Sequence, residues 1–485
     1  MPSLSHGLEK REFQGNEGFR RGGRHFVKFT RTGSDDSVLA RALGESPLSL
    51  MRFSLAAGAE LEYDVFLPLL TTAPFRRKPF LMDRCRASIY QVNSYGRTMN
   101  QQTPDCVRTV VCREAEQAHC WDEFLSQHPE AQIEQTSAWG KLKEVNGWKP
   151  LWVWVKRGSR LIGGAMILVR RVGVFTKRAG PILTIGYVER GPIWDPAEPG
   201  SLALVTRALF DAASSLHLSY LAVVPPYCGN SALPLFESMQ FRPKPEPLPP
   251  SGVGRATLLV DLRQNPETMF ADLSMTKRQN VRKAIRKGVR VRIGDGADAD
   301  TVRDLMWAAC RRRSVRPSPP QHDFFDNLWR LLSPSGRVNF FLAEIDGQSV
   351  AAGVVLIYHG KMNLWRVGWS GTHADYHPND LLHWEMMRWG HEHGCQTFDF
   401  MHIRPEHARA LLRGERVRAD AFSGITEFKI GFGGQLRLLP ELYYRSFNPI
   451  IHFALQLGMG RILNSPIYDG ALRNALLKIE RAPSI

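Results

Sequence analysis

The most distinctive residues for chemistry in this sequence are cations that line up along residues 274–289. Arg278, Arg282 and Arg286 are four residues apart, so in a helix they share one face. Each like-charged pair at this spacing costs about 0.2–0.5 kcal/mol in an isolated helix. A stripe that opposes helix formation indicates an anionic partner, and a solvated basic face is the alternative.

The same segment predicts how these cations are held. Val281, Ala284, Ile285 and Gly288 form a second stripe, with the spacing of a face that packs on a core. Ser274 is a favourable N-cap, and Gly288 is a favourable residue to end the helix. We therefore expect a helix that is docked on the protein through its apolar stripe.

Length, charge and hydropathy limit the class of protein. A chain of 485 residues exceeds what one hydrophobic core normally serves, so more than one domain is expected. The formal net charge of +16 and the pI near 9.7 favour polyanionic partners, namely nucleic acid, nucleotide diphosphates or anionic lipid headgroups. A mean hydropathy of -0.25 without a long apolar run predicts no membrane-spanning helix.

Cysteine and histidine usage gives no sign of a metal site. The 7 cysteines are scattered, without a CxxC pair or zinc-finger spacing, which favours a reduced, cytoplasmic setting. Histidines gather at residues 373–393, yet Glu392 between His391 and His393 does not complete the usual helical ligand motif with a separate base. We therefore predict no metal.

The first 98 residues differ in composition from the rest of the chain. Residues 19–31 are basic and rich in glycine, residues 76–78 are a second basic cluster, and neither shows a lasting apolar period. We predict that residues 1–98 are a disordered extension, or that Met99 is the true start of the protein. A functional basic tail is the alternative.

After this extension the sequence repeats itself. Residues 155–168 return in pattern as residues 344–357. Gly158 and Gly347 mark the same point of the pattern, at an offset of 189 residues. A duplicated α/β domain is the simplest explanation.

Each copy of the repeat predicts a β-hairpin. An apolar strand leads into a tight turn, at Arg157-Gly158 in the first copy and Asp346-Gly347 in the second, and a strand of small residues comes next. The second copy continues into a third strand at residues 361–369. This order predicts a three-stranded antiparallel meander.

The remaining pattern divides the chain into domains. The predicted helices around the hairpins are residues 129–146, 201–215, 299–313 and 379–393. The proline-rich run 242–250 reads as the connector between two halves. We predict a first domain at 99–252, a second domain at 253–445 and a C-terminal helical tail at 446–485. The tail either packs on the second domain or makes peripheral contact with a membrane.

A meander followed by a helix and a further strand resembles the acyl-CoA N-acyltransferase (GNAT) fold. We therefore expect the α/β (α+β) class, with tandem duplicated GNAT-like domains, each a mixed, largely antiparallel sheet flanked by helices. In that fold a glycine-rich loop before the long helix holds the pyrophosphate of coenzyme A (CoA) with its backbone amides. Here the corresponding residues 371–382 lack the glycine spacing, which predicts weakened CoA binding.

Several motifs resemble the FemAB family in order and spacing over about residues 107–445. They are QTSAWGKLK at 135–143, GW at 147–148, RGPIWD at 190–195, the helix at 277–288, LLHWE at 381–385, FDF at 398–400 and GITEFKIGFGG at 424–434. Members of this family have two N-acyltransferase-like domains. They use aminoacyl-tRNA to add amino acids to the peptide stem of a peptidoglycan precursor, which is a UDP-linked or lipid-linked muramyl peptide.

The resemblance implies residues that bind the acceptor. A lysine at the position of Lys143, an arginine from the 277–288 helix and a lysine matching Lys429 are implied to contact the precursor, the last two at its phosphates. Either Arg278 or Arg282 is the arginine in question. Arginine suits phosphate because its planar fork binds two oxygens, whereas lysine acts as a compact charge.

Aminoacyl transfer asks for positioning and for charge stabilisation. An aminoacyl ester is already activated, so a deprotonated amine held near the carbonyl attacks without a covalent enzyme intermediate. Lys429 is the candidate for stabilising negative charge on the carbonyl or on the leaving oxygen. Asp399 at the end of an apolar strand is the leading candidate for the general base, and Glu385 and His402 are alternatives. Asp399 and Glu385 can equally be packed, structural carboxylates.

The sequence also departs from the family. Relatives usually carry small glycines after the position of Phe400, whereas this chain has Met401 and His402, so we expect a remodelled acceptor pocket. The alternative function is a GNAT-type acyltransferase that uses acyl-CoA or a carrier protein in cell-envelope or exopolysaccharide biosynthesis. A non-enzymatic nucleic-acid-binding protein is a third reading. The expected location is the cytoplasm, including the inner face of the plasma membrane, and no cofactor beyond the donor substrate is expected.

Overall fold

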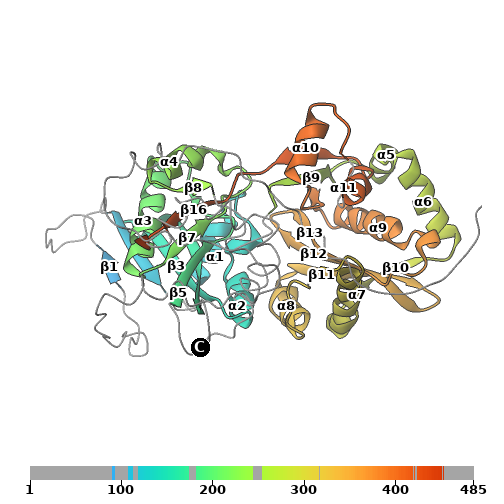
Figure 1. The fold of residues 1–485 in the computed structure, drawn as a ribbon, viewed down its shortest axis with the longest axis horizontal. Coiled ribbons are helices and arrows are strands. Elements are labelled where there is room, and N and C mark those ends of the chain that lie inside the picture. Colours follow the sequence, from blue (N-terminus) through green and yellow to red (C-terminus); the bar gives the residue numbers. More distant parts are fainter. Residues whose placement is uncertain are drawn as a thin grey trace, which may run out of the picture. The chain divides into compact units, whose positions relative to one another are not determined.

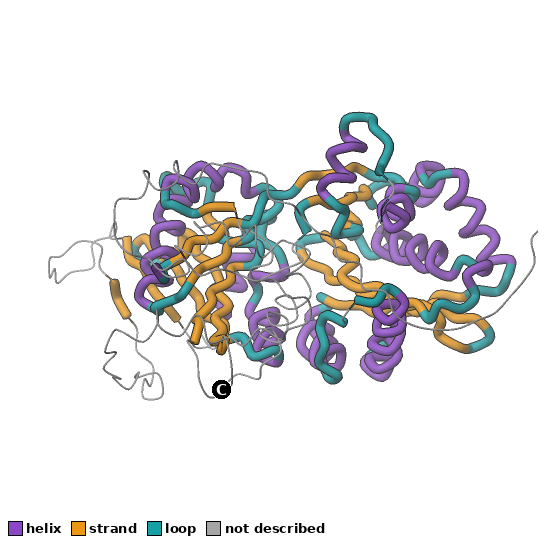
Figure 2. Tube along the Cα trace, viewed as in Figure 1, coloured by secondary structure: helices purple, strands orange, loops and turns teal. Residues whose placement is uncertain are grey.

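The computed structural model describes residues 90–92, 107–112, 118–173, 182–243, 254–315, 317–418, 420, 423–449 and 452. All of them belong to one compact unit, residues 81–485. Most of the extension 1–98, the connector 242–250 and the tail 446–485 lies outside the described residues. Among the described residues, strands form two separate mixed sheets, each flanked by helices (Figures 1 and 2).

The first sheet has the strand order β1-β2-β3-β4-β5-β7-β16-β8, and β6 pairs with β4. The strands are β1 (Tyr90–Val92), β2 (Val107–Cys112), β3 (Lys149–Arg157), β4 (Arg160–Gly173), β5 (Ile182–Val188), β6 (Ile193–Trp194), β7 (Tyr220–Val223), β8 (Arg242–Pro243) and β16 (Tyr443–Ser446). The helices of this half are α1 (Ala118–Ser126), η3 (Ile133–Gln135), α2 (Ser137–Val145), α3 (Ser201–Ser215), η4 (Gly229–Ala232) and α4 (Leu233–Ser238).

The second sheet has the order β10-β11-β12-β13-β14-β9-β15. Its strands are β9 (Ala256–Asp261), β10 (Arg290–Gly294), β11 (Val338–Ile345), β12 (Gln348–Tyr358), β13 (Lys361–Trp369), β14 (Thr397–Asp399) and β15 (Gln435–Leu438). The helices are α5 (Pro266–Asp272), α6 (Met275–Arg286), η5 (Gly296–Asp298), α7 (Ala299–Arg312), α8 (Phe324–Leu332), η6 (Ser333–Ser335), η7 (Ala374–Tyr376), α9 (Pro378–Glu392), α10 (Pro405–Leu412) and α11 (Ser423–Ile430).

Both predicted hairpins are present, as β3–β4 and β11–β12, and β13 completes the predicted meander. The first turn differs from the prediction by one residue. Arg157 pairs with Arg160, so the loop is Gly158-Ser159, and the structural offset to the Ile345–Gln348 pair is 188 residues. The reason is the position of the glycine in each two-residue loop. Gly158, with a φ of 58°, is the first loop residue of the first turn, whereas Gly347 is the second loop residue of the second turn.

Each sheet contains one parallel pair in an otherwise mainly antiparallel arrangement. In the first half β5 pairs in parallel with β7, and α3 connects them. In the second half β13 pairs in parallel with β14, and α9 connects them. The two halves therefore share one topology, and the carboxyl ends of each parallel pair lie at one edge of its sheet.

Two strands cross the predicted domain boundaries. β16, which includes residues 443–445 of the predicted second domain, lies in the first sheet between β7 and β8. β1, which lies inside the extension 1–98, pairs antiparallel with β2. The predicted boundaries at 98 and 445 therefore need correction, since β1 and β16 both belong to the first sheet. The sequence did not indicate this, because pairing with a distant strand leaves no local mark.

The two faces of the second sheet pack against different helices (Figure 1). Phe340 belongs to a core with residues of α7 and α8, and its neighbour Phe341 belongs to a core with residues of α6 and α9. Side chains of successive strand residues point to opposite faces, so this alternation is expected. The first of these cores also contains Trp139 and Leu142 of α2, so one apolar cluster joins the two halves.

The helix predicted from the basic stripe is α6. Ser274 caps it by accepting a hydrogen bond from the backbone N–H of Lys277, and Gly288 lies just beyond its end with a φ of 80°. Val281 is buried, as predicted, and so is Ala284. Ile285 is exposed, so that part of the prediction is wrong.

The physical reason lies in the true buried stripe of α6. Lys277, Val281 and Ala284 are the buried residues of the helix, and they are spaced i, i+4, i+7. The Nζ of Lys277 lies 2.8 Å from Oδ1 of Asp380 in α9, and both side chains are nearly inaccessible to solvent. The buried stripe thus runs through Lys277 and leaves Ile285 outside it.

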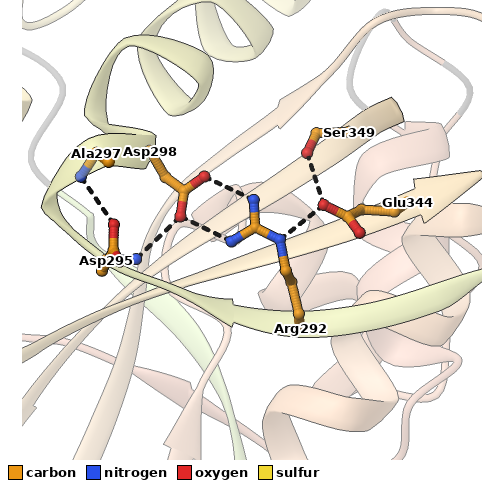
Figure 3. A network of polar contacts seen from close by, with 6 residues as sticks. All are labelled: Arg292, Asp295, Ala297, Asp298, Glu344 and Ser349. Carbon is orange, nitrogen blue, oxygen red and sulfur yellow. Dashed lines mark hydrogen bonds and ion pairs between the residues drawn. The ribbon is translucent and has the colours of Figure 1, made fainter. Parts of the chain in front are cut away.

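An ion-pair network fixes the edge of the second sheet (Figure 3). Arg292 in β10 donates to both carboxylate oxygens of Asp298, at 2.7 and 2.6 Å, and to Glu344 in β11 at 2.6 Å. The backbone N–H of Asp295 also donates to Asp298, at 2.9 Å. Together these contacts hold β10 in register and tie it to η5.

No helix in the described part of the chain is long and apolar enough to cross a membrane.

Candidate active site

The candidate site lies where the ends of strands from both halves meet. Glu189 and Arg190 come directly after β5, Tyr227 lies shortly after β7, and Asp399 is the last residue of β14. The hydroxyl of Tyr227 donates a hydrogen bond to Oδ2 of Asp399 at 2.8 Å. Because these residues are 172 positions apart, the site exists only when both halves are folded.

Asp399 is buried and has donors on both carboxylate oxygens. In addition to Tyr227 on Oδ2, the hydroxyl of Thr257 and the backbone N–H of Met401 donate to Oδ1, the latter at 2.6 Å. Burial raises the pKa of the Asp399 carboxyl, and the hydrogen bonds from Thr257 and Tyr227 act in the opposite direction. This environment suits a carboxylate that positions its neighbours.

The segment after Asp399 has an unusual backbone. Met401 and His402 both have positive φ, 49° and 44°, a region that favours glycine. The hydrogen bond from the N–H of Met401 to Asp399 helps to hold this conformation. Glycine adopts such a conformation at less cost, and this chain holds it with larger side chains.

Lys429, in the last turn of α11, is held by that segment. Its Nζ donates to the carbonyl oxygen of Met401 at 2.6 Å and to that of His402 at 3.2 Å. Burial lowers the pKa of Lys429 to about 8, and the nearby charge of Asp399 acts in the opposite direction. The structure thus brings Lys429 and Asp399, two of the predicted site residues, onto the same short loop.

Lys143 is the predicted site residue of the first half. Its Nζ lies 3.0 Å from Oε2 of Glu189 and 4.9 Å from the centre of the Trp139 ring. The indole N–H of Trp139 donates to the same oxygen at 3.0 Å. Glu189 therefore orients both Lys143 and Trp139 at the end of β5.

Arg190 is buried beside the link between the two halves. Its guanidinium lies 4.6 Å from the centre of the Tyr227 ring and donates through Nη2 to the carbonyl oxygen of Gly254 at 3.4 Å. Its other terminal nitrogen, Nη1, has no hydrogen-bond partner among the described residues. The φ of Arg190 is 55°, so a strained backbone aims this cation at the site.

Glu134, in η3, is a buried carboxyl close to this cluster. Its Oε2 has no hydrogen-bond partner in the described part of the chain. Burial, and then the charge of Glu189, raise the pKa of Glu134 to about 7, and Arg190 acts in the opposite direction. A carboxyl with this pKa exchanges a proton near neutral pH.

Three titratable residues around Asp399 keep accessible surface and still have shifted pKa values. His402 is exposed to solvent, yet the protein around it, together with the cations Arg366 and Lys429, lowers the pKa of its imidazole to about 3. Tyr227 and Lys429 also keep part of their surface exposed while protein surrounds them. The protein around these side chains disfavours the charged form of each, which raises the pKa of Tyr227 and lowers those of His402 and Lys429.

The predicted arginines lie on α6 and have other contacts. Arg278 donates to the carbonyl oxygens of Ala271 and Leu273, at the end of α5. The guanidinium of Arg282 lies 5.3 Å from the centre of the Phe270 ring. No contact between described residues joins either arginine to Asp399 or Lys429.

The alternative bases have different surroundings. Glu385 in α9 forms an ion pair with Arg388, one turn further along the helix. His402 lies beside Gly254 and does not approach Asp399 in any hydrogen bond of the described residues. Among the described residues there is also no group of three His, Cys, Asp or Glu side chains that could hold a metal ion.

Known proteins resemble this chain in sequence and in fold. Residues 275–409 match the family of the acetyltransferase (GNAT) domain. The chain is 20% identical to the lipid II:glycine glycyltransferase of Staphylococcus aureus, over 58% of this chain and 82% of that protein. Its fold matches the crystal structure of FemX with a TM-score of 0.59 and 17% identity, over 71% of this chain and 98% of that one.

This chain is a FemAB-like protein of the GNAT fold. The predicted family resemblance and the predicted tandem arrangement of two GNAT-like sheets are confirmed. The comparisons also relate the chain to GNAT-fold acyltransferases.

Several residues of the site in this FemAB-like protein were not predicted. Arg190 opens the RGPIWD motif, to which no role was assigned, and Glu134 directly precedes the QTSAWGKLK motif. Tyr227 and Thr257 gave no signal, because each lies in or just after an apolar strand like many other polar residues. A polar residue at or shortly after the carboxyl end of an apolar strand is the pattern that could have found Glu189 and Tyr227.

The N-terminus of α9 is the place where a GNAT domain would hold the pyrophosphate of CoA. Here Pro378 opens the helix and has no N–H to donate. Asp380 lies in the first turn, and its carboxylate binds Lys277 at 2.8 Å and Asn280 at 3.2 Å. A carboxylate therefore occupies the end of the helix that would attract a phosphate.

Proposed function

We propose that this FemAB-like protein is an aminoacyltransferase. It moves an activated aminoacyl group from aminoacyl-tRNA to an amine of a diphosphate-bearing cell-wall precursor, a UDP-linked or lipid-linked muramyl peptide. The observation that carries the choice of donor is the carboxylate of Asp380 in the first turn of α9. With its partner Lys277 it forms a buried ion pair where a CoA pyrophosphate would have to bind. The choice of acceptor is supported by the similarity to the lipid II:glycine glycyltransferase of Staphylococcus aureus, whose name gives lipid II as a substrate.

The corresponding loop of the first half supports the same choice of donor. It carries Asp195 and Glu198 before α3, the helix that matches α9 of the second half. Glu198 lies 2.8 Å from Arg157, and Asp195 is paired with Arg160. In both halves, carboxylates paired with cations thus lie near the helix end where the phosphates of CoA would bind.

The proposed reaction is direct attack of the acceptor amine on the ester carbonyl. The new C–N bond forms, the bond between the carbonyl carbon and the ribose oxygen breaks, and the amine proton ends on the ribose hydroxyl. Lys429 stabilises the negative charge that develops on the carbonyl oxygen, since it is a half-buried cation fixed by two carbonyl groups.

The carboxylates have separate roles in this proposal. Asp399 positions the Met401–His402 segment that carries Lys429, because both of its oxygens already accept hydrogen bonds. Glu134 holds the proton that leaves the amine, since its pKa of about 7 suits that exchange. Lys143, Arg278 and Arg282 remain the proposed contacts to the acceptor and its phosphates.

The proposed donor places the reaction in the cytoplasm, where aminoacyl-tRNA is found. A lipid-linked acceptor would bring the protein to the inner face of the plasma membrane. A second candidate, transfer from acyl-CoA or a carrier protein in envelope or exopolysaccharide biosynthesis, is favoured by the match of residues 275–409 to the acetyltransferase domain.

Calorimetry on the full chain distinguishes the two donors and tests the acceptor. We expect saturable binding of a UDP-linked muramyl pentapeptide and none of acetyl-CoA. Lys429→Ala should weaken the binding, whereas Lys149→Ala, which removes an exposed lysine on β3, should not. Binding of acetyl-CoA alone would overturn the proposal in favour of the second candidate.

A further inference from the structure

The outward face of α6 combines exposed aliphatic side chains with cations. Met275 is 66% exposed and Ile285 is 56% exposed, which is unusual for such large apolar residues. Arg282 and Arg286 are exposed beside them on the same face. Together with the half-buried Lys283, which follows Arg282, these four side chains define what we call the α6 face.

This face cannot turn inward without unfolding its surroundings. Val281 and Ala284 are fully buried against the core that contains α9, and Ile285 lies at the exposed margin of their stripe. The ion pair between Lys277 and Asp380 fixes the same side. The exposure of the α6 face is therefore imposed by the way the helix is docked.

The charge of α6 is of one sign. Residues 275–287 contain six cations and no Asp or Glu. Lys287 is neutralised by Asp375, and Arg278 is bound by two backbone carbonyls. Within the described part of the chain, Arg282 and Arg286 form no ion pair with a carboxylate, so the α6 face is electrostatically complementary to an anionic surface.

A neighbouring strand extends the apolar part of this surface. Ile293 in β10 is 50% exposed and pairs with Phe341 in β11. Phe341 packs in the core shared with α6 and α9, so directly paired Ile293 points to that same side of the sheet. The edge strand thus adds a third large aliphatic side chain on the side of the sheet that carries α6.

We propose that the α6 face docks on the surface of a bilayer that contains anionic lipids, with Met275 and Ile285 entering the headgroup region and Lys283 and Arg286 contacting lipid phosphates. Alternating cations and aliphatic side chains fit this interface, because it offers both phosphate groups and acyl chains. A nucleic acid offers phosphates but no apolar layer to cover Met275 and Ile285. The inference does not rest on the proposed reaction.

Docking through this face would place the candidate site close to the bilayer. The backbone N–H of Ser274, which caps α6, donates to the carbonyl oxygen of Gly431 at 2.8 Å. Gly431 lies two residues after Lys429. A direct backbone contact therefore fixes the docked helix to the segment that carries the proposed catalytic lysine.

Co-sedimentation of the full chain with lipid vesicles tests the proposal. We expect binding to phosphatidylcholine vesicles that contain phosphatidylglycerol, and much weaker binding to phosphatidylcholine alone. Replacing both exposed aliphatics, Met275→Gln with Ile285→Gln, should lower the partition coefficient by about tenfold. Lys283→Gln with Arg286→Gln should lower it on the anionic vesicles by a similar factor.

Matched controls separate this face from general effects of charge and hydrophobicity. Leu412→Gln removes an aliphatic side chain of α10 that is 55% exposed, and Arg330→Gln removes an exposed cation of α8. Neither should change vesicle binding. Unchanged binding in both α6 double variants would overturn the proposal, as would binding of total tRNA that depends on Lys283 and Arg286 without any vesicle binding.

Discussion

The hydroxyl of Tyr227 in the first half lies 2.8 Å from Oδ2 of Asp399 in the second half, and it donates a hydrogen bond to that oxygen. The same carboxylate holds the backbone of Met401, whose carbonyl oxygen in turn accepts from Lys429. A series of three contacts thus connects the first half to the proposed catalytic lysine. Substitutions at either end of this series should therefore affect turnover.

Tyr227→Phe should lower both stability and turnover. The change leaves a buried carboxylate oxygen without its donor, which costs about 1–3 kcal/mol in the free energy of unfolding. Tyr443→Phe is the matched control, because Tyr443 donates to Glu237 at 2.9 Å away from the site. Urea unfolding should show a loss for both variants, whereas kcat should fall only for Tyr227→Phe. Equal kcat in the two variants would remove Tyr227 from the site.

Lys429→Ala should affect turnover far more than stability. Loss of a preorganised cation near a developing oxyanion lowers kcat by about 10²–10³-fold. The free energy of unfolding should fall by no more than about 1–2 kcal/mol, the worth of hydrogen bonds to two carbonyls. Transfer assays and urea unfolding on the same preparation check both numbers. A variant that loses stability but keeps kcat would make Lys429 a structural residue only.

The rate should fall as pH rises through about 8, because the pKa of Lys429 is lowered to that value and the proposed role needs the ammonium form. Lys429→Arg keeps a positive charge at all pH values up to about 12. The residual activity of this variant should therefore lose its alkaline limb. A wild-type profile that stays flat up to about pH 10, the usual pKa range of a lysine, would contradict the lowered pKa of Lys429, and an unchanged alkaline limb in Lys429→Arg would contradict its role.

Arg282→Ala should weaken binding of the diphosphate-bearing acceptor, and the effect should shrink at high salt. Arg282 is the cleaner test of the two predicted arginines, since Arg278 also binds the carbonyls of Ala271 and Leu273 and its loss should lower stability as well. Calorimetric Kd values at two salt concentrations measure this effect. Arg330→Ala serves as the control for an exposed cation. If Arg278→Ala and Arg282→Ala together leave Kd unchanged, the basic stripe does not bind the acceptor.

Glu134→Gln should change the pH dependence of stability. The pKa of Glu134 rises on folding from 4.5 to about 7, so the folded state binds more protons than the unfolded state between these values. Its contribution therefore favours folding at low pH and is lost as pH rises through this window, on the order of 3 kcal/mol in total. The variant should lack this loss. Urea unfolding at about pH 5 and about pH 7.5, near the two ends of the window, compares the two proteins, and an identical pH dependence would show that Glu134 does not titrate there.

Local features of the fold could be read from the sequence. The bounds of α3 and of β13 were predicted to the residue, and Ser274 and Gly288 delimit α6 as expected. The repeat of the hairpin predicted a duplicated domain. These features depend on periodicity, capping and turn preferences, which act over a few residues and leave a mark in the sequence.

The surroundings of each site residue were decided by the tertiary structure. The partners of Asp399 include Thr257 and Tyr227, 142 and 172 residues away, and no local pattern marks either of them. The same holds for Lys277, whose partner Asp380 is 103 residues away, and for Ile285, which is exposed although its spacing fits the apolar stripe. The sequence by itself determined which helices, turns and charges exist. Only folding decided which charges are buried and paired, because burial and pairing depend on groups that become neighbours when distant segments pack.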